Sequence, residues 1–212
     1  METAKTAAKA FVEQQPPNVL IGVIAFSDSG FSVQSPTNVR EPVLATIDRM
    51  KPQRGTSLGQ GIMAALTVLE QEKNGGDLVY SDRTPEPTPS PTPVPQGTYS
   101  PAVIVLLSDG ENNGPPDPLQ AAQTAADRGV RIFTVGLGSA EGAVLNIEGF
   151  RVRSRLDEAL LSQIAAISGG AYFKAEDEAG LTSVYEDLIP QLQIKDEKME
   201  ITALLAGLSI LI

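Results

Sequence analysis

Apolar residues in this chain follow two patterns that alternate from the N-terminus onward. The first pattern is a short continuous run rich in β-branched residues, which is typical of a strand covered on both faces. Such runs lie at residues 19–26 (VLIGVIAF), 102–107 (AVIVLL) and 130–135 (VRIFTV), with a shorter one at residues 171–174 (AYFK). Each run predicts one strand of a buried sheet.

The second pattern places apolar residues at helical spacing, with polar residues on the opposite side. Strands that alternate with such helices predict an α/β fold, in which a doubly wound, mostly parallel sheet carries helices on both faces. Ligands of such sheets bind beyond the carboxyl ends of the strands. The helical pattern covers residues 2–13, 41–50, 58–72, 118–128, 156–167 and 181–192.

Two further segments predict antiparallel hairpins. Residues 27–30 (SDSG) are typical of a tight turn, and they join the first strand to the run FSVQ, which we expect at an edge of the sheet. Residues 148–149 (EG) separate the runs VLNI and FRVR in the same way. The sheet is therefore expected to be parallel in its centre and antiparallel only in these hairpins.

The chain contains no Cys and no His, and this absence removes a large part of enzyme chemistry. It excludes a Ser-His-Asp triad, a thiolate nucleophile and a zinc site built on nitrogen or sulfur. Any metal must be held by oxygen, as Mg²⁺ and Ca²⁺ are. The formal net charge of −10 argues against nucleic acid as a partner.

Between Pro85 and Pro95 every second residue is proline. Such a segment is extended and hydrated and cannot join a core, so we expect an insertion over about residues 75–100. We interpret it as a spacer loop, with a recruitment motif for a proline-reading module as the alternative. Because it precedes the strand at residues 102–107, it should lie at the opposite end of the sheet from a ligand site.

The last twelve residues, 201–212 (ITALLAGLSILI), contain no charged residue. They are too few to cross a bilayer, which takes about 20. We interpret residues 1–198 as one domain and residues 199–212 as the start of a transmembrane helix, the alternative being a buried core segment. The protein is then expected in the cell membrane with a single C-terminal anchor. The preceding KDEK mixes both signs of charge and does not fix the side on which the domain lies.

Two loops at the expected ligand edge of the sheet carry oxygen ligands. Asp109 directly follows the strand at residues 102–107, and Thr56 lies in QRGTSLG ahead of the helix at residues 58–72. Each residue has a purely structural interpretation, because Asp-Gly after a strand is usually a turn and Thr before a helix is usually an N-cap. Neither loop defines a site when it is taken alone.

Taken together and in order, the two loops resemble a known family. RGTSLGQGIMAAL, followed by PAVIVLLSDGENNGPPDPLQAAQTAADRGVRIFTVGLG, is similar to the second and third segments of a von Willebrand factor A domain. The resemblance runs from about Glu2 to Gln193 and points to the bacterial membrane-anchored members. In that family a metal-ion-dependent adhesion site is built from a D-x-S-x-S segment, a Thr loop and an Asp loop. Thr56 matches the second of these contributions and Asp109 the third.

The D-x-S-x-S segment has no counterpart here, because the family places it after a first strand and ahead of the helix at residues 2–13. Asp28, in SDSG, belongs to a hairpin turn after a different strand, so we do not expect it to replace the missing ligands. The resemblance places the missing strand in the middle of the sheet, between residues 19–26 and 102–107. We expect those two strands to lack a backbone partner and to expose edges.

The resemblance implies a binding module in which a cation at Thr56 and Asp109 presents an open coordination position to a carboxylate of a partner protein. Mg²⁺ or another divalent cation is implied, weakly bound or absent in this chain because the ligand set is incomplete. By analogy with the family, we expect this protein in the bacterial envelope, where some members of the family work with AAA-type ATPases. We expect no enzyme activity.

Two alternatives stay open. One is a fragment with no metal function. The other is a Mg²⁺-dependent hydrolase or phosphoryl-transfer enzyme that uses Asp109 as nucleophile or metal ligand. The enzyme is disfavoured because the sequence has no Walker-type phosphate loop and places no second carboxylate or general base beside Asp109.

Overall fold

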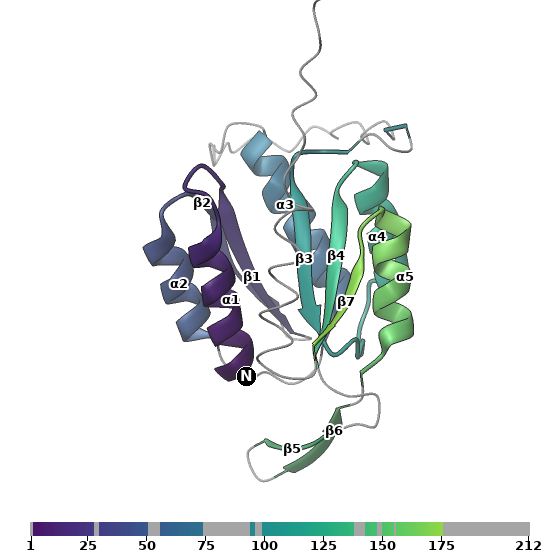
Figure 1. Ribbon diagram of the computed structural model, residues 1–212. Helices are drawn as coiled ribbons and strands as arrows, with labels where there is room; N and C mark the ends of the chain where they lie inside the picture. The colour runs from purple at the N-terminus through teal and green to yellow at the C-terminus, as the bar shows by residue number, and fades with distance from the viewer. Residues whose placement is uncertain are drawn as a thin grey trace, which may run out of the picture.

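Helices and strands alternate through the computed structural model, which describes residues 2–27, 30–50, 56–73, 94–95, 99–137, 143–147, 150–154 and 156–175 (Figure 1). The helices are α1 (Glu2–Gln14), α2 (Arg40–Arg49), α3 (Leu58–Lys73), α4 (Pro118–Asp127) and α5 (Glu158–Ser168). The strands are β1 (Ile21–Ser27), β2 (Gly30–Thr37), β3 (Val103–Ser108), β4 (Arg131–Leu137), β5 (Ala143–Ile147), β6 (Phe150–Ser154) and β7 (Tyr172–Ala175). Each of these elements lies within a residue or two of a segment that the apolar pattern predicts, except that β2 continues three residues beyond the predicted run FSVQ.

Three parallel strands form the centre of the fold, in the order β3, β4, β7. β4 lies between the other two, and its residues Ile132, Phe133 and Val135 are at most 2% exposed. Helices cover both faces: α3, α4 and α5 pack on one face, while Phe11 of α1 packs on the other (Figure 1). The structure therefore confirms the α/β fold with a parallel sheet and helices on both faces.

β1 and β2 form a separate antiparallel hairpin, as the SDSG segment predicts, although residues 28–29 lie outside the described residues. α1 and α2 pack against this hairpin through a small apolar cluster around Val12, Val43 and Ile47. β5 and β6 pair with each other as the second predicted hairpin. The antiparallel pairs are thus two local additions to a parallel centre.

β1 and β3 each have one edge that no described strand pairs with. This agrees with the expectation that both strands lack a backbone partner. The prediction that both are buried on both faces is wrong: in β1 Gly22 is exposed and the described side chains around it are only partly buried, and within β3 only Leu106 is buried. The physical reason is the open edge, since no neighbouring strand shields the flank of these side chains.

The described residues on either side of the proline segment lie at the end of the sheet away from Asp109. α3 ends at Lys73, and the Ser100 N–H donates to the Gly129 carbonyl at 2.8 Å just ahead of β3. These flanks are where the sequence places them, whereas most of the proline segment lies outside the described residues. The same is true of the helix predicted at residues 181–192 and of the apolar segment at residues 201–212. In the part of the chain that the structure describes, no helix is long and apolar enough to cross a membrane.

Candidate functional site

The loop ahead of α3 carries two adjacent hydroxyls with different roles. Ser57 caps the helix, because its Oγ accepts a hydrogen bond from the Gln60 N–H at 3.3 Å. A side chain in this position satisfies one of the N–H groups that the first turn of a helix leaves unpaired. Thr56 lies one residue earlier, and its hydroxyl makes no hydrogen bond within the described residues. The capping role therefore belongs to Ser57 and leaves the Thr56 hydroxyl available to a ligand.

Asp109 begins the turn that follows β3. Its Oδ1 accepts a hydrogen bond from the Glu111 N–H at 3.1 Å, and Ser108 Oγ accepts one from the Gly110 N–H at 3.0 Å. Gly110 has a φ of +83°, in the left-handed region that favours glycine. The turn role suggested by Asp-Gly is therefore present. It does not exclude a second role, because a carboxylate offers about four lone-pair sites.

One backbone–backbone and one backbone–side-chain hydrogen bond hold the Thr56 loop against the Asp109 loop. The Asn113 N–H donates to the Thr56 carbonyl at 2.8 Å. In the other direction, the Leu58 N–H donates to Asn112 Oδ1 at 3.0 Å. The structure thus brings the two predicted loops together at the carboxyl end of β3.

Close packing reinforces this contact at the first turn of α3. The Ser57 hydroxyl donates to the Pro115 carbonyl at 2.8 Å. A Cβ added to Gly59 would lie 2.2 Å from the Pro116 carbonyl oxygen, so only glycine allows the helix to approach the loop so closely. Sequence reasoning identified the glycines of this segment but missed Ser57, although Ser57 and Gln60 have the spacing of a capping box.

The start of α5 is a third segment at this edge of the sheet. The Asp157 N–H donates to the Asp109 carbonyl at 2.8 Å, and Asp157 Oδ1 caps α5 by accepting from the Leu160 N–H at 3.0 Å. A Cβ on Gly110 would lie 2.7 Å from the Asp157 carbonyl oxygen. Sequence reasoning did not place this second acidic residue beside Asp109, because a local pattern at Asp157 signals a helix cap and nothing about its neighbour.

The oxygen donors at this edge suit a hard cation. Thr56 offers a hydroxyl and Asp109 a carboxylate, which are ligand types that Mg²⁺ and Ca²⁺ accept. Both residues are partly buried, so the edge is reachable from solvent. Within the described residues no three acidic side chains gather as a metal site. A cation at Thr56 and Asp109 would therefore keep several waters, as Mg²⁺ typically does.

Tyr172 on β7 has a shifted pKa, and its side chain packs against Gly136 of the neighbouring strand. Burial raises the pKa of Tyr172 to about 12, and the nearby Glu158 carboxylate adds to the shift. The Tyr172 hydroxyl is buried without a hydrogen-bond partner in the described part of the chain. Glu158 instead pairs with Lys174 at 3.1 Å. Tyr172 is therefore a packing residue of the sheet.

A parallel sheet between helices, with polar loops that meet beyond its strand ends, is the architecture of α/β domains that place ligand sites at this edge of the sheet. The sequence profile of the von Willebrand factor type A domain matches residues 1–187, and the chain belongs to that family.

Sequence relatives extend beyond the region that this chain covers. The chain is similar to a UPF0353 protein of Mycobacterium avium, with 32% identity over 198 residues. That match covers 91% of this chain and 54% of the relative, so the chain spans about half the length of the curated relatives it matches. What a whole relative does is therefore a separate question from the fold.

Solved structures share this fold. An aerotolerance-related membrane protein from Bacteroides fragilis has a TM-score of 0.67 at 21% identity, over 90% of this chain and 87% of that one. Proximal thread matrix protein 1 of the mussel byssus, solved with a zinc-occupied MIDAS motif, has a TM-score of 0.56 at 18% identity, over 89% of this chain and 41% of that one. At these identities the likeness establishes the fold alone.

Proposed function

We propose that this chain is a non-enzymatic protein-binding module whose site holds a divalent cation, Mg²⁺ or a related ion, at Thr56 and Asp109. The observation that carries the proposal is the division of roles in the loop ahead of α3. Ser57 caps the helix, which leaves the Thr56 hydroxyl without a structural task beside the Asp109 turn. A hydroxyl and a carboxylate held on two hydrogen-bonded loops are suited to a shared cation.

The partner that this site favours is a protein that offers an acidic side chain. One carboxylate and one uncharged hydroxyl leave about half of the positive charge of a divalent cation uncompensated, so the cation attracts a further carboxylate. Open coordination positions, filled by water in the unbound module, provide the place for it. The chain's formal charge of −10 makes nucleic acid an unfavourable partner.

Two features support a bacterial membrane-anchored protein as the setting of the module. Residues 201–212 are uncharged and largely apolar, and a protein of the same fold from Bacteroides fragilis is described as an aerotolerance-related membrane protein. We infer that a single C-terminal anchor holds the domain at the cell membrane. An AAA-type ATPase as a working partner remains a proposal by family analogy.

A melting experiment on an extended chain tests the cation site. A strand ending in D-x-S-x-S, added ahead of Glu2, supplies the family's remaining ligand oxygens. Mg²⁺ should then raise the melting temperature relative to EDTA, because ligand binding to the folded state contributes about 2.7 kcal/mol at a hundredfold excess over the Kd. The chain without the extension should respond only weakly, since Mg²⁺ gives up its waters reluctantly.

Four variants of the extended chain locate the cation. Asp109→Ala should abolish the Mg²⁺ response, and Thr56→Ala should weaken it. Ser57→Ala removes the cap and the hydrogen bond to the Pro115 carbonyl, so it should cost about 1–2 kcal/mol with or without Mg²⁺ and weaken the Mg²⁺ response less than Thr56→Ala does. Asp28→Ala should have no effect. A response that Asp28→Ala removes and Asp109→Ala leaves, or no response at all, would show that the site is on other loops.

A further inference from the structure

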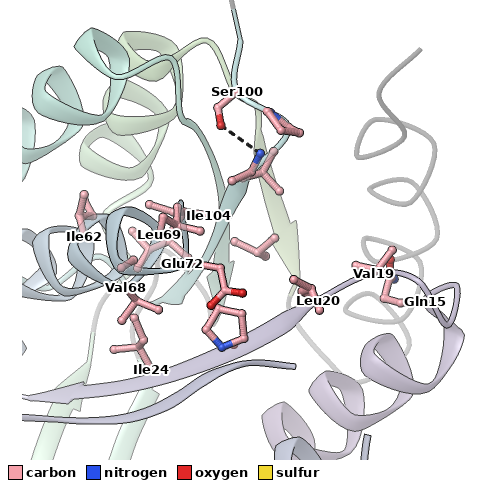
Figure 2. A pocket seen from close by; sticks show the side chains of 18 of the residues that line it. Gln15, Val19, Leu20, Ile24, Ile62, Val68, Leu69, Glu72, Ser100 and Ile104 are labelled. Carbon is pink, nitrogen blue, oxygen red and sulfur yellow. Dashed lines mark hydrogen bonds between the residues drawn. The ribbon is translucent and has the colours of Figure 1, made fainter. Parts of the chain in front are cut away.

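The apolar groove between β1 and β3 belongs to the sheet itself. It has a volume of about 910 Å³, and Figure 2 shows Ile24 of β1, Ile104 of β3 and Leu69 of α3 around it. Glu72 is the one charged residue among the described residues that line it. The family resemblance places a further strand of the same domain in this position, so the groove is not a surface for a partner. An acidic partner needs a basic surface near the cation site instead.

The hairpin of β5 and β6 lies at the carboxyl end of the central sheet. It connects the end of β4 to the start of α5, and Figure 1 shows it projecting beyond the edge at which β3 ends. Asp157, whose N–H donates to the Asp109 carbonyl at 2.8 Å, follows the last residue of β6, Ser154, by three positions. Three residues span at most about 11 Å, so the base of the hairpin lies within that distance of a residue that contacts the Asp109 turn.

The register of the hairpin divides its residues between two faces. Directly paired residues share a face of an antiparallel pair, and neighbours along each strand alternate between the faces. At the four positions nearest the turn, the first face is apolar: Leu145, Ile147, Phe150 and Val152. The second face carries Arg151 and Arg153, which pair with Asn146 and Val144. The hairpin therefore has an apolar face and an arginine face.

The arginine face is a positive exception in an acidic chain. Residues 143–154 contain two arginines and one acidic residue, whereas the whole chain has a formal charge of −10. Arg151 and Arg153 are two positions apart on β6, which corresponds to about 7 Å along the strand. Guanidinium groups bind carboxylates through paired hydrogen bonds. Carboxylates at a similar spacing would therefore complement this face.

We propose that the arginine face is a second contact surface for the acidic partner protein of the cation site. One carboxylate of the partner completes the coordination of the cation, and further carboxylates pair with Arg151 and Arg153. This inference rests on the proposed function and adds a feature that the partner must have. That feature is an acidic segment reaching on the order of 10–20 Å beyond the carboxylate at the cation, as the length of the hairpin requires.

The hairpin also offers a readout of its own. Among the described strands, β5 and β6 pair only with each other. A two-stranded hairpin alone is marginally stable in water, so contact with a partner should stabilise it. Amide hydrogen exchange in β5 and β6 should therefore slow when an acidic segment binds, while exchange in β4 should stay unchanged.

The test is peptide binding to the whole chain that carries the D-x-S-x-S extension, measured in Mg²⁺ and in EDTA. The probe is a peptide of about 16 residues with glutamate at every second position, which reaches about 50 Å when extended. Its glutamates have the two-residue spacing of the arginines. The control peptide has glutamine in place of each glutamate. The glutamate peptide should bind about tenfold more tightly, because only it offers charges to the cation and the arginines.

Chain variants separate the arginines from the bulk charge. Arg151→Gln combined with Arg153→Gln should weaken binding about three- to tenfold in Mg²⁺ and in EDTA alike, the range of two solvent-accessible ion pairs. Replacing both by lysine keeps the charge and should recover part of the affinity. The matched control, Lys73→Gln combined with Arg128→Gln, removes the same charge at the opposite end of the sheet. It should change the affinity less than about twofold, because salt screens charges at that distance.

Asp109→Ala distinguishes a failure of the hairpin contact from a failure of the cation site. It should remove the Mg²⁺-dependent part of the affinity and leave the part that the arginines supply. Equal binding in Mg²⁺ and EDTA, with a loss in the arginine variant, would overturn the cation site and keep the hairpin contact. Binding that depends on Mg²⁺ and Asp109 but not on the arginines would overturn the hairpin contact alone.

Two further results would contradict the hairpin contact. An equal loss of affinity in the control at Lys73 and Arg128 would mean that the peptide responds to net charge and not to the arginine face. Binding without slower amide exchange in β5 and β6 would mean that the peptide binds elsewhere. Melting temperatures of both double variants should stay at that of the unmodified chain, which excludes unfolding as the cause of a loss.

Discussion

The two halves of this domain differ in how completely their strands are enclosed. β4 has a strand on each edge, helices on one face and Phe11 of α1 on the other, and Ile132 and Val135 within it are fully buried. Among the described strands β1 has a partner on one edge only, and Leu20 just ahead of it is 52% exposed. The β1 segment is nevertheless the more apolar of the two in sequence, since β4 contains Arg131 and Thr134. The difference shows that burial of such a run depends on its neighbours in the sheet as much as on its own composition.

The largest expected effect contrasts the same substitution in the two halves. Ile132→Ala in β4 should lower the free energy of unfolding by about 2–5 kcal/mol, because it leaves a cavity in an enclosed core. Ile24→Ala in β1 should cost less than half as much, since its side chain is already partly exposed in a strand with one open edge. Urea unfolding measures both. Equal losses would mean that the open side of β1 is filled in solution.

A smaller effect is expected where α3 meets the loop after β3. Gly59→Ala places a Cβ 2.2 Å from the Pro116 carbonyl oxygen, and relief of this overlap should cost about 1–3 kcal/mol. Gly114→Ala is the matched control in the same loop, because its Cβ would have its nearest neighbour at 3.9 Å. It should change stability by no more than about 0.5 kcal/mol. Similar losses for the two variants would mean that the loops are not held as closely as the structure describes.

The smallest effect is expected for the buried hydroxyl of Tyr172 on β7. Tyr172→Phe should leave stability at neutral pH unchanged or raise it by about 1 kcal/mol, because it removes a buried hydroxyl that has no partner. The folded chain keeps the Tyr172 proton up to a pKa of about 12, while the unfolded chain loses it near the ordinary value of 10. This contribution to stability is therefore present below pH 10 and is lost between pH 10 and 12. Unfolding curves across that window should decline less steeply for Tyr172→Phe than for the unmodified chain.

Sequence alone predicted the elements well because each depends on a local pattern. The β-branched runs gave the strands of the central sheet, and helical spacing gave α1 to α5 within a residue or two. Burial was less predictable, because the pattern of residues 19–26 does not reveal whether a strand lies beside them. The open edges of β1 and β3 were expected from the family resemblance, which places a further strand between them, and not from the apolar pattern itself.

The candidate site was predictable in its residues and less so in its surroundings. Thr56 and Asp109 could be selected from the order of their loops, and the structure brings those loops together. The cap at Ser57 and the contact of Asp157 with Asp109 could not be selected in the same way. The cap was assigned to Thr56 and not to Ser57. The contact of Asp157 with Asp109 joins segments that are far apart in the sequence. Whether Thr56 and Asp109 bind a cation stays a prediction.

Anomalous diffraction from crystals of the chain soaked in Mn²⁺ tests that central claim most directly, because it locates the ion itself. Mn²⁺ accepts the same oxygen ligands as Mg²⁺, so it should occupy the same place. The account predicts an anomalous peak between Thr56 Oγ1 and the Asp109 carboxylate, bound directly or through one water, which Asp109→Ala removes. A peak at Asp28 or Asp157 instead, or no peak at Thr56 and Asp109 even in the chain extended with D-x-S-x-S, would contradict the cation site and with it the proposed binding mechanism.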